Sequence, residues 1–355
     1  MVESGDSRPI VTVTGISGYV GSHVALRLLK DGSYRVRGTV RNKNNAEKID
    51  PLRLAFGELF GQVELVEADL LDAASMQRAI DGSTYVIHVA SPFVIEAPKD
   101  PMVLIRPAVE GTKSVLQACK KAGVRRVSLT SSCVAIYEMN DADAPDVFDE
   151  SHWSNVDKPR IGAYEKSKTL AEMAAWSFIE DLPDDDKIEL TTVNPGLIVG
   201  PTMVPGDFTS GRILSMFMNN QLPGGIPRIA MSIVDVREVA EAHVQCIKRD
   251  EAQGKRFALV SRMLWMQEIG RTLHGQFAHM GYSIPTGLAS YCLVRTIGCC
   301  RADARNIAAN WGKEINVSNK RSKEVLGINY RPEEDSLREM AESLMDKGII
   351  RDRRP

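Results

Sequence analysis

Blocks of apolar and polar residues alternate along the first 200 positions, with lengths that suit strands and helices in turn. Short runs rich in β-branched and apolar residues predict six strands, at 10–14, 34–41, 63–68, 85–90, 127–132 and 190–194. Apolar residues at helical spacing predict the helices between them, after position 21, at 45–61, 73–80 and 103–122, and from 164 to 181. This alternation predicts an α/β fold with a doubly wound parallel (Rossmann) sheet, whose ligands bind at the carboxyl ends of the strands.

Beyond Pro201 the regular alternation of strands and helices ends, and short elements separated by proline turns follow. A helix at 236–248 and a strand at 257–260 are expected to return to the sheet. We therefore predict a dinucleotide-binding domain over residues 1–200, with 231–261 returning to it, and a smaller substrate lobe over 201–230 and 262–345. The basic end of the chain, residues 346–355, is expected to be a flexible tail.

The composition narrows the class of partner. The 355 residues carry a formal net charge of −2 and 43% of them are hydrophobic, which is ordinary for a globular protein. No sustained basic patch and no apolar run of roughly 18 residues occurs, so neither nucleic acid nor a membrane span is expected. The polar start, Met1 to Pro9, is unlike a secretory signal, which favours a cytoplasmic location. The six cysteines lack metal-ligand spacing and are expected to be reduced thiols, with no metal site.

The first predicted strand runs into three glycines spaced by three, Gly15, Gly18 and Gly21, before an apolar helix begins. Such a glycine pattern predicts dinucleotide binding when it lies between a strand and a helix, as it does here. A residue without Cβ lets the backbone approach a pyrophosphate, and the helix start offers it free N–H groups and a positive dipole end. Taken alone, the pattern also fits an ordinary turn between a strand and a helix.

The end of the second strand indicates which dinucleotide binds. Arg41 stands 20 positions after Gly21, where NAD-binding folds often carry an acidic residue for the ribose hydroxyls. A guanidinium there favours a 2′-phosphate, and hence NADP, and Lys48 could add positive charge. The alternative for these residues is a solvated basic loop.

Other candidate residues stand where strands end. Asp69 and Leu70 follow the third strand, where Asp69 could border an adenine or act as the N-cap of the helix at 73–80. Ser91 follows the fourth strand, and Ser131 and Ser132 end the fifth. Because parallel strands end at one edge of a sheet, all of these side chains are expected near the bound ligand.

Tyr164 and Lys168 are one helical turn apart, so their side chains are neighbours. A nearby ammonium lowers the pKa of a phenol, and a tyrosine tuned in this way can protonate the alkoxide that forms as a hydride reaches a carbonyl. Ser132 could hydrogen-bond the same substrate oxygen. The pair alone also fits a helix surface, but it follows a dinucleotide turn and a Ser-Ser strand end.

These motifs together resemble the extended short-chain dehydrogenase/reductases, and among them the dihydroflavonol reductase-like branch of dihydroflavonol, anthocyanidin, cinnamoyl-CoA and aldehyde reductases. The resemblance covers residues 10–240, and more weakly the chain up to 345. The runs that carry it are Thr14 to Gly21, Val40-Arg41, Ala68 to Leu70, His88 to Pro92, Thr130 to Ser132, Tyr164 to Lys168, Asn194 to Gly196 and Val234 to Arg237.

The resemblance implies a catalytic triad of Ser132, Tyr164 and Lys168, and it favours Ser132 over Ser131, which the residues alone leave open. It further implies that NADP is bound by Gly15, Ser17, Gly18, Tyr19, Val20 and Gly21, by Arg41 and Lys48 at the 2′-phosphate, by Asp69 and Leu70 at the adenine, by Val89, Ala90 and Ser91 at the ribose and pyrophosphate, and by Tyr164, Lys168, Pro195 and Ser210 at the nicotinamide end.

The activity expected from these motifs is the NADPH-dependent reduction of an aldehyde or ketone by a monomer or homodimer. Two alternatives use the same scaffold: a 3β-hydroxysteroid dehydrogenase or nucleotide-sugar epimerase/dehydratase, and a non-catalytic regulator that senses NADP. Nucleotide-sugar enzymes usually retain NAD, which Arg41 disfavours, and a regulator of this kind would lack the Tyr164 and Lys168 pair.

Overall fold

The structure, a computed structural model, describes residues 6–91, 100–140, 142–159, 161–206, 208–222 and 224–354, except the side chains of 302 and 303. Pro92, the last residue of one of the motifs above, lies outside these ranges. The larger part of the molecule is built on a seven-stranded sheet of order β3-β2-β1-β4-β5-β6-β9. Its strands are β1 (Ile10–Thr14), β2 (Arg35–Val40), β3 (Val63–Glu67), β4 (Tyr85–His88), β5 (Arg126–Thr130), β6 (Glu189–Pro195) and β9 (Arg256–Leu259).

Every pairing in this sheet is parallel, so all its strands end at the same edge. The order reverses between β1 and β4, which is the point where a doubly wound sheet opens a crevice for its ligand. The predicted fold class is thereby confirmed.

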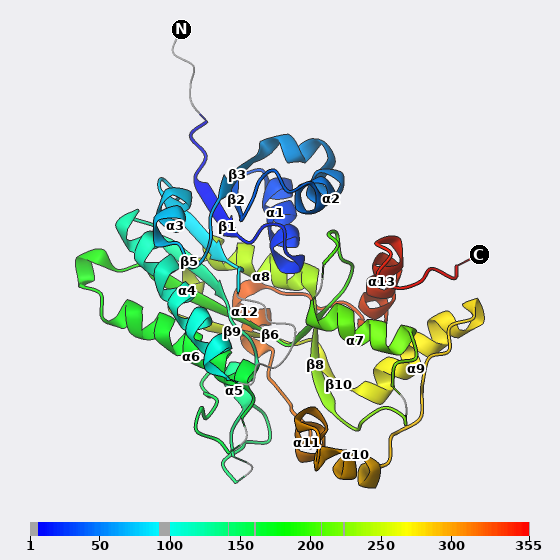
Figure 1. Ribbon diagram of the computed structural model, residues 1–355. Helices are drawn as coiled ribbons and strands as arrows, with labels where there is room; N and C mark the ends of the chain where they lie inside the picture. The colour runs from blue at the N-terminus through cyan, green and yellow to red at the C-terminus, as the bar shows by residue number, and fades with distance from the viewer. Residues whose placement is uncertain are drawn as a thin grey trace.

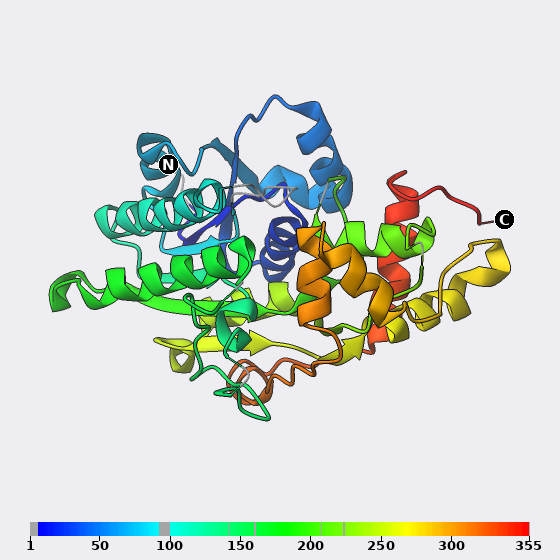
Figure 2. The ribbon, with the colours of Figure 1, turned by 60° about the horizontal axis from the view of Figure 1, so that its bottom comes forward.

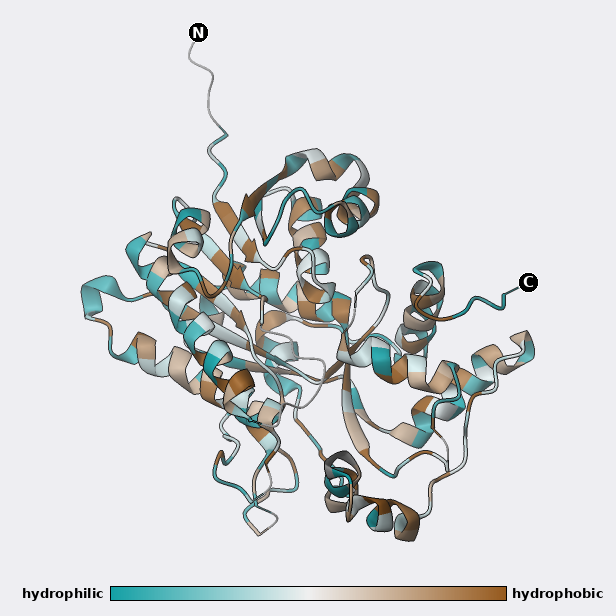
Figure 3. Cartoon of the chain, viewed as in Figure 1, coloured by the Kyte–Doolittle hydropathy of each residue, from teal (hydrophilic) through white to brown (hydrophobic). Residues whose placement is uncertain are grey.

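Helices cover both faces of the sheet (Figures 1 and 2). One face carries α3 (Ala73–Ile80), α4 (Met102–Lys121) and α6 (Ala163–Glu180), and the other carries α1 (Tyr19–Asp31) and α8 (Val236–Lys248). The neighbours Val86 and Ile87 on β4 point to opposite faces, and both are 0% exposed. Double coverage favours apolar residues on such strands, and β1, which follows the N-terminus, is largely brown in Figure 3. The strands β2, β3, β5 and β6 also carry charged or polar residues.

Shorter elements fill the connections of this larger part. They are α2 (Ala46–Phe56), η1 (Gly57–Gln62), α5 (Val134–Tyr137), η2 (Asp184–Asp186), η3 (Asp250–Ala252) and α12 (Lys320–Leu326). The last of them, α12, packs against α8 and β9, so a late segment of the chain joins the dinucleotide-binding part rather than the lobe.

The lobe is organised around a second, three-stranded sheet of order β10-β8-β7. Its elements are β7 (Leu197–Val199), α7 (Thr209–Met218), β8 (Ala230–Asp235), β10 (Arg262–Trp265), α9 (Met266–Phe277), η4 (Ala278–Met280), α10 (Tyr291–Gly298), α11 (Ala302–Ala309) and α13 (Glu333–Asp346). Helices α7, α9 and α13 pack on this sheet, and α10 and α11 pair with each other at the outer edge of the lobe (Figure 1).

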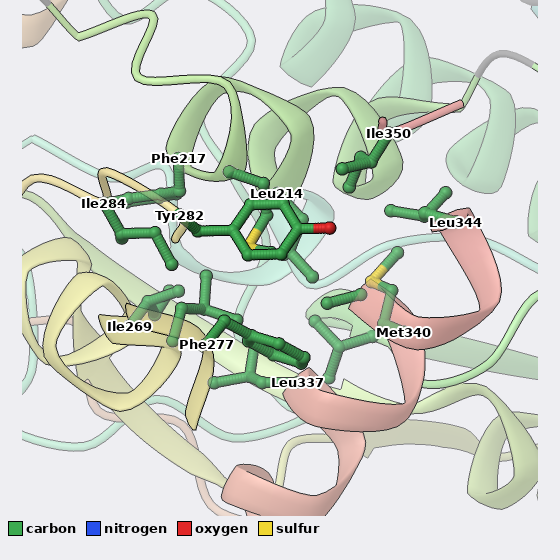
Figure 4. Packing of buried hydrophobic residues seen from close by; sticks show 14 of the residues in the cluster. Leu214, Phe217, Ile269, Phe277, Tyr282, Ile284, Leu337, Met340, Leu344 and Ile350 are labelled. Atoms are coloured by element: carbon green, nitrogen blue, oxygen red, sulfur yellow. The ribbon is translucent and has the colours of Figure 1, made fainter. Parts of the chain in front are cut away.

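Besides α12, two further segments differ from the expected division of the chain. Within 231–261, only α8 and β9 return to the large sheet, because β8 pairs with β7 and β10 instead. The end of the chain, expected to be flexible, is held by the lobe: Ile350 is 0% exposed, and the hydroxyl of Tyr282 donates to the Arg351 carbonyl at 2.7 Å. Figure 4 shows Ile350 beside Leu344 and the ring of Tyr282 in the same apolar cluster. Two isoleucines in a basic run were too little signal to predict this packing.

No helix in the described ranges has the length and apolar character to cross a membrane.

Candidate functional site

The glycine turn joins β1 to α1 at the edge of the sheet where the strands end. Gly15 has a φ of +71°, a conformation that strains residues with a side chain, and its N–H donates to the Thr39 hydroxyl at 3.0 Å. Gly18 is the N-cap of α1 and no side chain caps the helix, so the first N–H groups of α1 remain open to a ligand. A Cβ on Gly21 would collide with the Gly15 carbonyl oxygen and lie 2.9 Å from its carbon. The turn therefore depends on glycine at both Gly15 and Gly21.

The side chain of Tyr19 does not face the turn. It is buried, its hydroxyl donates to the Gly200 carbonyl at 2.8 Å, and its ring stacks on Phe208 at 4.3 Å. Tyr19 can therefore contribute only its backbone to a ligand at the turn, while its side chain fastens α1 to the lobe. Ser17 is partly exposed at the turn, and Val20 packs between apolar clusters of both parts.

A buried threonine organises the neighbouring strand end. The Thr14 hydroxyl accepts from the N–H groups of Val89 and Ala90, both at 3.1 Å, and lies 2.7 Å from Nδ1 of His88. Because its oxygen already accepts two hydrogen bonds, the hydroxyl donates its own proton to Nδ1, which places the imidazole proton of neutral His88 on Nε2. Burial lowers the pKa of His88 to about 3, so this imidazole stays neutral. No role for Thr14 or His88 follows from the sequence motifs. The two residues lie opposite each other on the paired strands β1 and β4, which only the fold reveals.

The residues expected at the adenine end lie on the same edge. Arg41 is exposed just after β2, and Lys48 is half-buried on α2. Leu70 lines a small cavity together with Ala90, Ser91 and Lys168. Asp69 is exposed, and it accepts from the Leu71 N–H at 2.9 Å in a local turn.

The alternative role of Asp69 as a helix cap is wrong. Asp72 is the N-cap of α3, and its carboxylate accepts from the N–H groups of Ala74 and Ser75 at 3.0 and 3.3 Å. The physical reason is position: Asp72 directly precedes the helix, and a cap reaches only the next two or three N–H groups.

The three catalytic candidates come together at the start of α6. The Ser132 hydroxyl is near enough to the Tyr164 phenol to influence its pKa; Tyr164 keeps 47% of its surface exposed, while Ser132 is buried. Burial of the ring raises the pKa of the Tyr164 phenol above its ordinary value, opposite to the lowering expected from a nearby ammonium, and the interaction with Ser132 offsets part of this rise. Burial lowers the pKa of Lys168 to about 8, and its ammonium donates to the Ser91 hydroxyl at 3.4 Å.

The geometry separates Ser131 from Ser132. Ser131 donates its hydroxyl to the buried carboxylate of Glu172 at 2.5 Å, so it is not directed at Tyr164. The carbonyl of Pro195 lies 3.5 Å from the Ser132 hydroxyl and accepts from the Cys133 N–H at 2.9 Å, which holds this loop on β6. Ser210 is buried on α7, on the lobe side of the crevice.

Glu172 and Arg256 are two buried charged residues near the site that the motifs did not assign. Their ion pair has Arg256 Nε 2.7 Å from Glu172 Oε1, and joins α6 to β9 across the catalytic loop. Glu172 follows Lys168 by one helical turn, so a count along the Tyr164 and Lys168 face would have found it. Arg256 carries no such signal, because it follows Glu172 by 84 positions.

Comparison with known proteins agrees with this arrangement. Residues 11–259 match the model of the NAD dependent epimerase/dehydratase family. A cinnamoyl-CoA reductase from Medicago truncatula is 33% identical over 344 residues, which are 95% of this chain and 96% of that protein. An NADPH-dependent methylglyoxal reductase from Saccharomyces cerevisiae is 30% identical over 354 residues, 94% of this chain and 98% of that protein.

The crystal structure of a yeast methylglyoxal/isovaleraldehyde reductase in complex with NADPH resembles the chain along nearly its whole length. The TM-score is 0.77 at 28% sequence identity, with 96% of this chain and 100% of the other covered. The lobe and the dinucleotide-binding part are thus both shared with that enzyme.

Proposed function

Since the chain belongs to the NAD dependent epimerase/dehydratase family, we propose that it is an NADPH-dependent reductase of aldehydes or ketones. The observation that carries the proposal is the meeting of Tyr164, Ser132 and Lys168 at the edge of the sheet where the glycine turn lies. Relatives that span nearly the whole chain bear names of NADPH-dependent and carbonyl-reducing enzymes, which supports the same reaction class.

The residues present fit a dinucleotide. The turn leaves the first N–H groups of α1 uncapped, and the absence of a side chain at Gly21 lets α1 pack closely on the Gly15 backbone. We assign the pyrophosphate to Gly15, Ser17, Gly18, Tyr19, Val20 and Gly21, with Tyr19 acting through its backbone. The exposed guanidinium of Arg41, with Lys48, is assigned to the 2′-phosphate, which favours NADPH over NADH.

The remaining assignments follow the strand ends. Asp69 and Leu70 border the adenine, Val89, Ala90 and Ser91 the ribose and pyrophosphate, and Pro195 and Ser210 the nicotinamide end. The lobe built on β7, β8 and β10 is assigned to the substrate.

NADPH, when bound, supplies the hydride that reduces the substrate carbonyl. Tyr164 supplies the proton to the carbonyl oxygen, and Ser132 donates a hydrogen bond to the same oxygen. The Lys168 ammonium stabilises the phenolate that Tyr164 becomes after it gives up its proton. Because burial lowers the pKa of Lys168 to about 8, its charge is carried by most molecules only below that pH.

We further propose a cytoplasmic location and a protein that works as a monomer or homodimer. The six cysteines, all within the described ranges, are free thiols, which supports a reducing compartment. Sedimentation equilibrium distinguishes the two assembly states.

The test is a spectrophotometric screen of NADPH oxidation against aldehydes, diketones, flavonoids and steroids, with the wild type and Tyr164→Phe side by side. The wild type should reduce at least one aldehyde or ketone. Tyr164→Phe should lose roughly 10²- to 10⁴-fold in kcat while its NADPH affinity stays nearly unchanged. Co-purified NAD with poor NADP binding would instead favour an epimerase, and NADPH binding without any turnover would favour a regulator.

A further inference from the structure

Glu172 lies at the centre of a buried hydrogen-bond network that the proposed reaction does not use. It is 1% exposed, and both of its carboxylate oxygens accept hydrogen bonds. The donors are Ser131 Oγ at 2.5 Å, Asn194 Nδ2 at 2.7 Å, Arg256 Nε at 2.7 Å, Thr192 Oγ1 at 2.9 Å and Trp176 Nε1 at 3.3 Å. These donors come from α6, β6, β9 and the loop after β5, so one carboxylate ties together four segments that meet beneath the catalytic residues.

Two of the donors hold the loop that carries Ser132. Ser131, its neighbour, is bonded directly to Glu172. The amide of Asn194 donates both to Glu172 and to the backbone carbonyl of Ser132, the latter at 3.2 Å. The Ser132 hydroxyl, which influences the pKa of Tyr164, therefore stands on a loop that Glu172 holds in two ways: directly through the Ser131 side chain, and through Asn194 at the Ser132 backbone.

Glu172 also faces Lys168 from within the protein. The two residues are one turn apart on α6, and both line a cavity of about 20 Å³, which is wide enough for one water molecule. His88 on β4 lines the same cavity but is neutral, and Arg256 on β9 lies behind the carboxylate as its ion-pair partner. Among the described residues around Lys168, the charge of Glu172 is the one that opposes the effect of burial on its pKa.

We propose that Glu172 is a positioning residue of the site: it fixes the Ser132 loop through Ser131 and Asn194, and it holds its negative charge against the Lys168 ammonium. The kinetic part of this proposal rests on the proposed reductase function, whereas the effect on Lys168 can be measured without turnover. Glu172 itself touches neither substrate nor cofactor.

A purely architectural role is the competing explanation, because Arg256 binds more than Glu172. Its guanidinium also donates to the carbonyls of Glu150, His152 and Ala135 and lies 3.7 Å from the ring centre of Trp153. Removing the carboxylate leaves this buried cation unpaired, so a loss of stability alone would not identify a positioning role.

Four variants separate the alternatives. Glu172→Gln keeps the shape and removes the charge, whereas Glu172→Asp keeps the charge and shortens the reach to Ser131. Ser131→Ala removes the hydrogen bond between Ser131 and Glu172 and leaves the ion pair of Glu172 with Arg256 intact. Glu238→Gln is the matched control, because Glu238 is also buried, accepts from two backbone N–H groups and lies near Arg331, yet it stands on α8 away from Tyr164.

Three quantities are measured on the full-length protein: the thermal midpoint, kcat against pH, and the pKa of Lys168 from ¹⁵N-lysine NMR, with Lys168→Met identifying the resonance. Glu172→Gln should lower kcat roughly 10- to 100-fold and shift the Lys168 pKa, and with it the basic limb of kcat, to lower pH. Glu172→Asp and Ser131→Ala should lower kcat without moving that limb. Glu238→Gln should leave kcat and the Lys168 pKa unchanged when each variant is assayed at the same interval below its own thermal midpoint.

The proposal is overturned if Glu172→Gln keeps the wild-type Lys168 pKa, or if its kinetic change equals that of Glu238→Gln at equal stability. Should Glu172→Gln fail to fold, Ser131→Ala tests whether Glu172 holds the Ser132 loop, and the double variant Glu172→Gln/Arg256→Gln, which leaves no buried cation unpaired, tests by NMR whether the carboxylate charge sets the Lys168 pKa. A wild type without any carbonyl reduction would refute the proposed function, and the NMR comparison would still decide whether Glu172 governs Lys168.

Discussion

The glycine turn and the network around Glu172 lie at the same edge of one sheet, but the turn uses backbone groups and the network uses side chains. At the turn, Gly15 and Gly21 contribute no side chain, and the function of the segment depends on the open backbone between β1 and α1. At the other end, Glu172 draws five side chains from four segments into one buried cluster. A phosphate needs close approach of N–H groups, whereas a proton donor needs a fixed orientation, and each end supplies what its task requires.

The difference also decides how each end responds to substitution. A backbone cradle fails when atoms are added, and a side-chain network fails when atoms are removed. The following predictions test this contrast, beginning with the substitution that should do the most damage.

Gly21→Ala should destabilise the protein by about 3 kcal/mol and abolish measurable NADPH binding, because the new Cβ would collide with the Gly15 carbonyl. Gly61→Ala is the matched control, since a Cβ at Gly61 meets nothing within 4 Å. Chemical denaturation and cofactor fluorescence titration measure the two effects. Equal behaviour of the two variants would show that the turn does not depend on the missing side chain.

Thr14→Val should cost about 2 kcal/mol in the free energy of unfolding, because it orphans the N–H groups of Val89 and Ala90 and the Nδ1 of His88. Thr112→Val, whose hydroxyl is bonded only to a carbonyl of its own helix α4, should cost less than about 1 kcal/mol. Urea unfolding measures both. A Thr14→Val variant as stable as Thr112→Val would remove Thr14 from its organising role.

Arg41→Ala should weaken NADPH roughly 10-fold or more and leave NADH affinity unchanged, because a charge-assisted hydrogen bond to the 2′-phosphate is worth about 1.5–3 kcal/mol. Arg53→Ala on α2, an exposed arginine whose guanidinium lies over the ring of Phe60, is the control for a general loss of positive charge. Dissociation constants for both cofactors are needed for both variants. Parallel losses for NADPH and NADH would contradict the assignment of Arg41.

The contrast also explains what could be read from the sequence. The large sheet follows from short apolar strands alternating with helices, and this prediction is confirmed because each such element buries its own apolar face. Gly15, Gly18, Gly21, Tyr164 and Lys168 could be proposed because the chemistry requires their spacing within one turn or one helix, and their roles stay predictions.

The unpredicted parts depend on contacts between distant positions. The ion pair of Glu172 with Arg256 spans 84 positions, and no local pattern announces it. Ile350 is buried in the same apolar cluster as Tyr282, which precedes it by 68 positions (Figure 4). Likewise, the apolar sequence of β8 would suit either sheet, and its pairing with β7 and β10 places it in the smaller one.

The smallest predicted effect concerns the pH dependence of the reaction, to which the buried imidazoles of His88 and His243 and the half-buried ammonium of Lys168 should contribute differently. Burial lowers the pKa of His88 and of His243 to about 3, so neither should titrate between pH 5 and 8. Burial lowers the pKa of Lys168 to about 8, so the fraction that carries the ammonium falls as the pH rises through that value. If the charged form assists Tyr164, kcat/KM for carbonyl reduction should be flat from pH 5 to 7 and fall about twofold between pH 7 and 8. Initial rates at saturating NADPH across this range measure it, with Glu238→Gln as control. A limb below pH 7 that disappears in Glu238→Gln would belong to that carboxyl, whose pKa burial raises to about 7, and a limb that persists in this variant would contradict the flat profile.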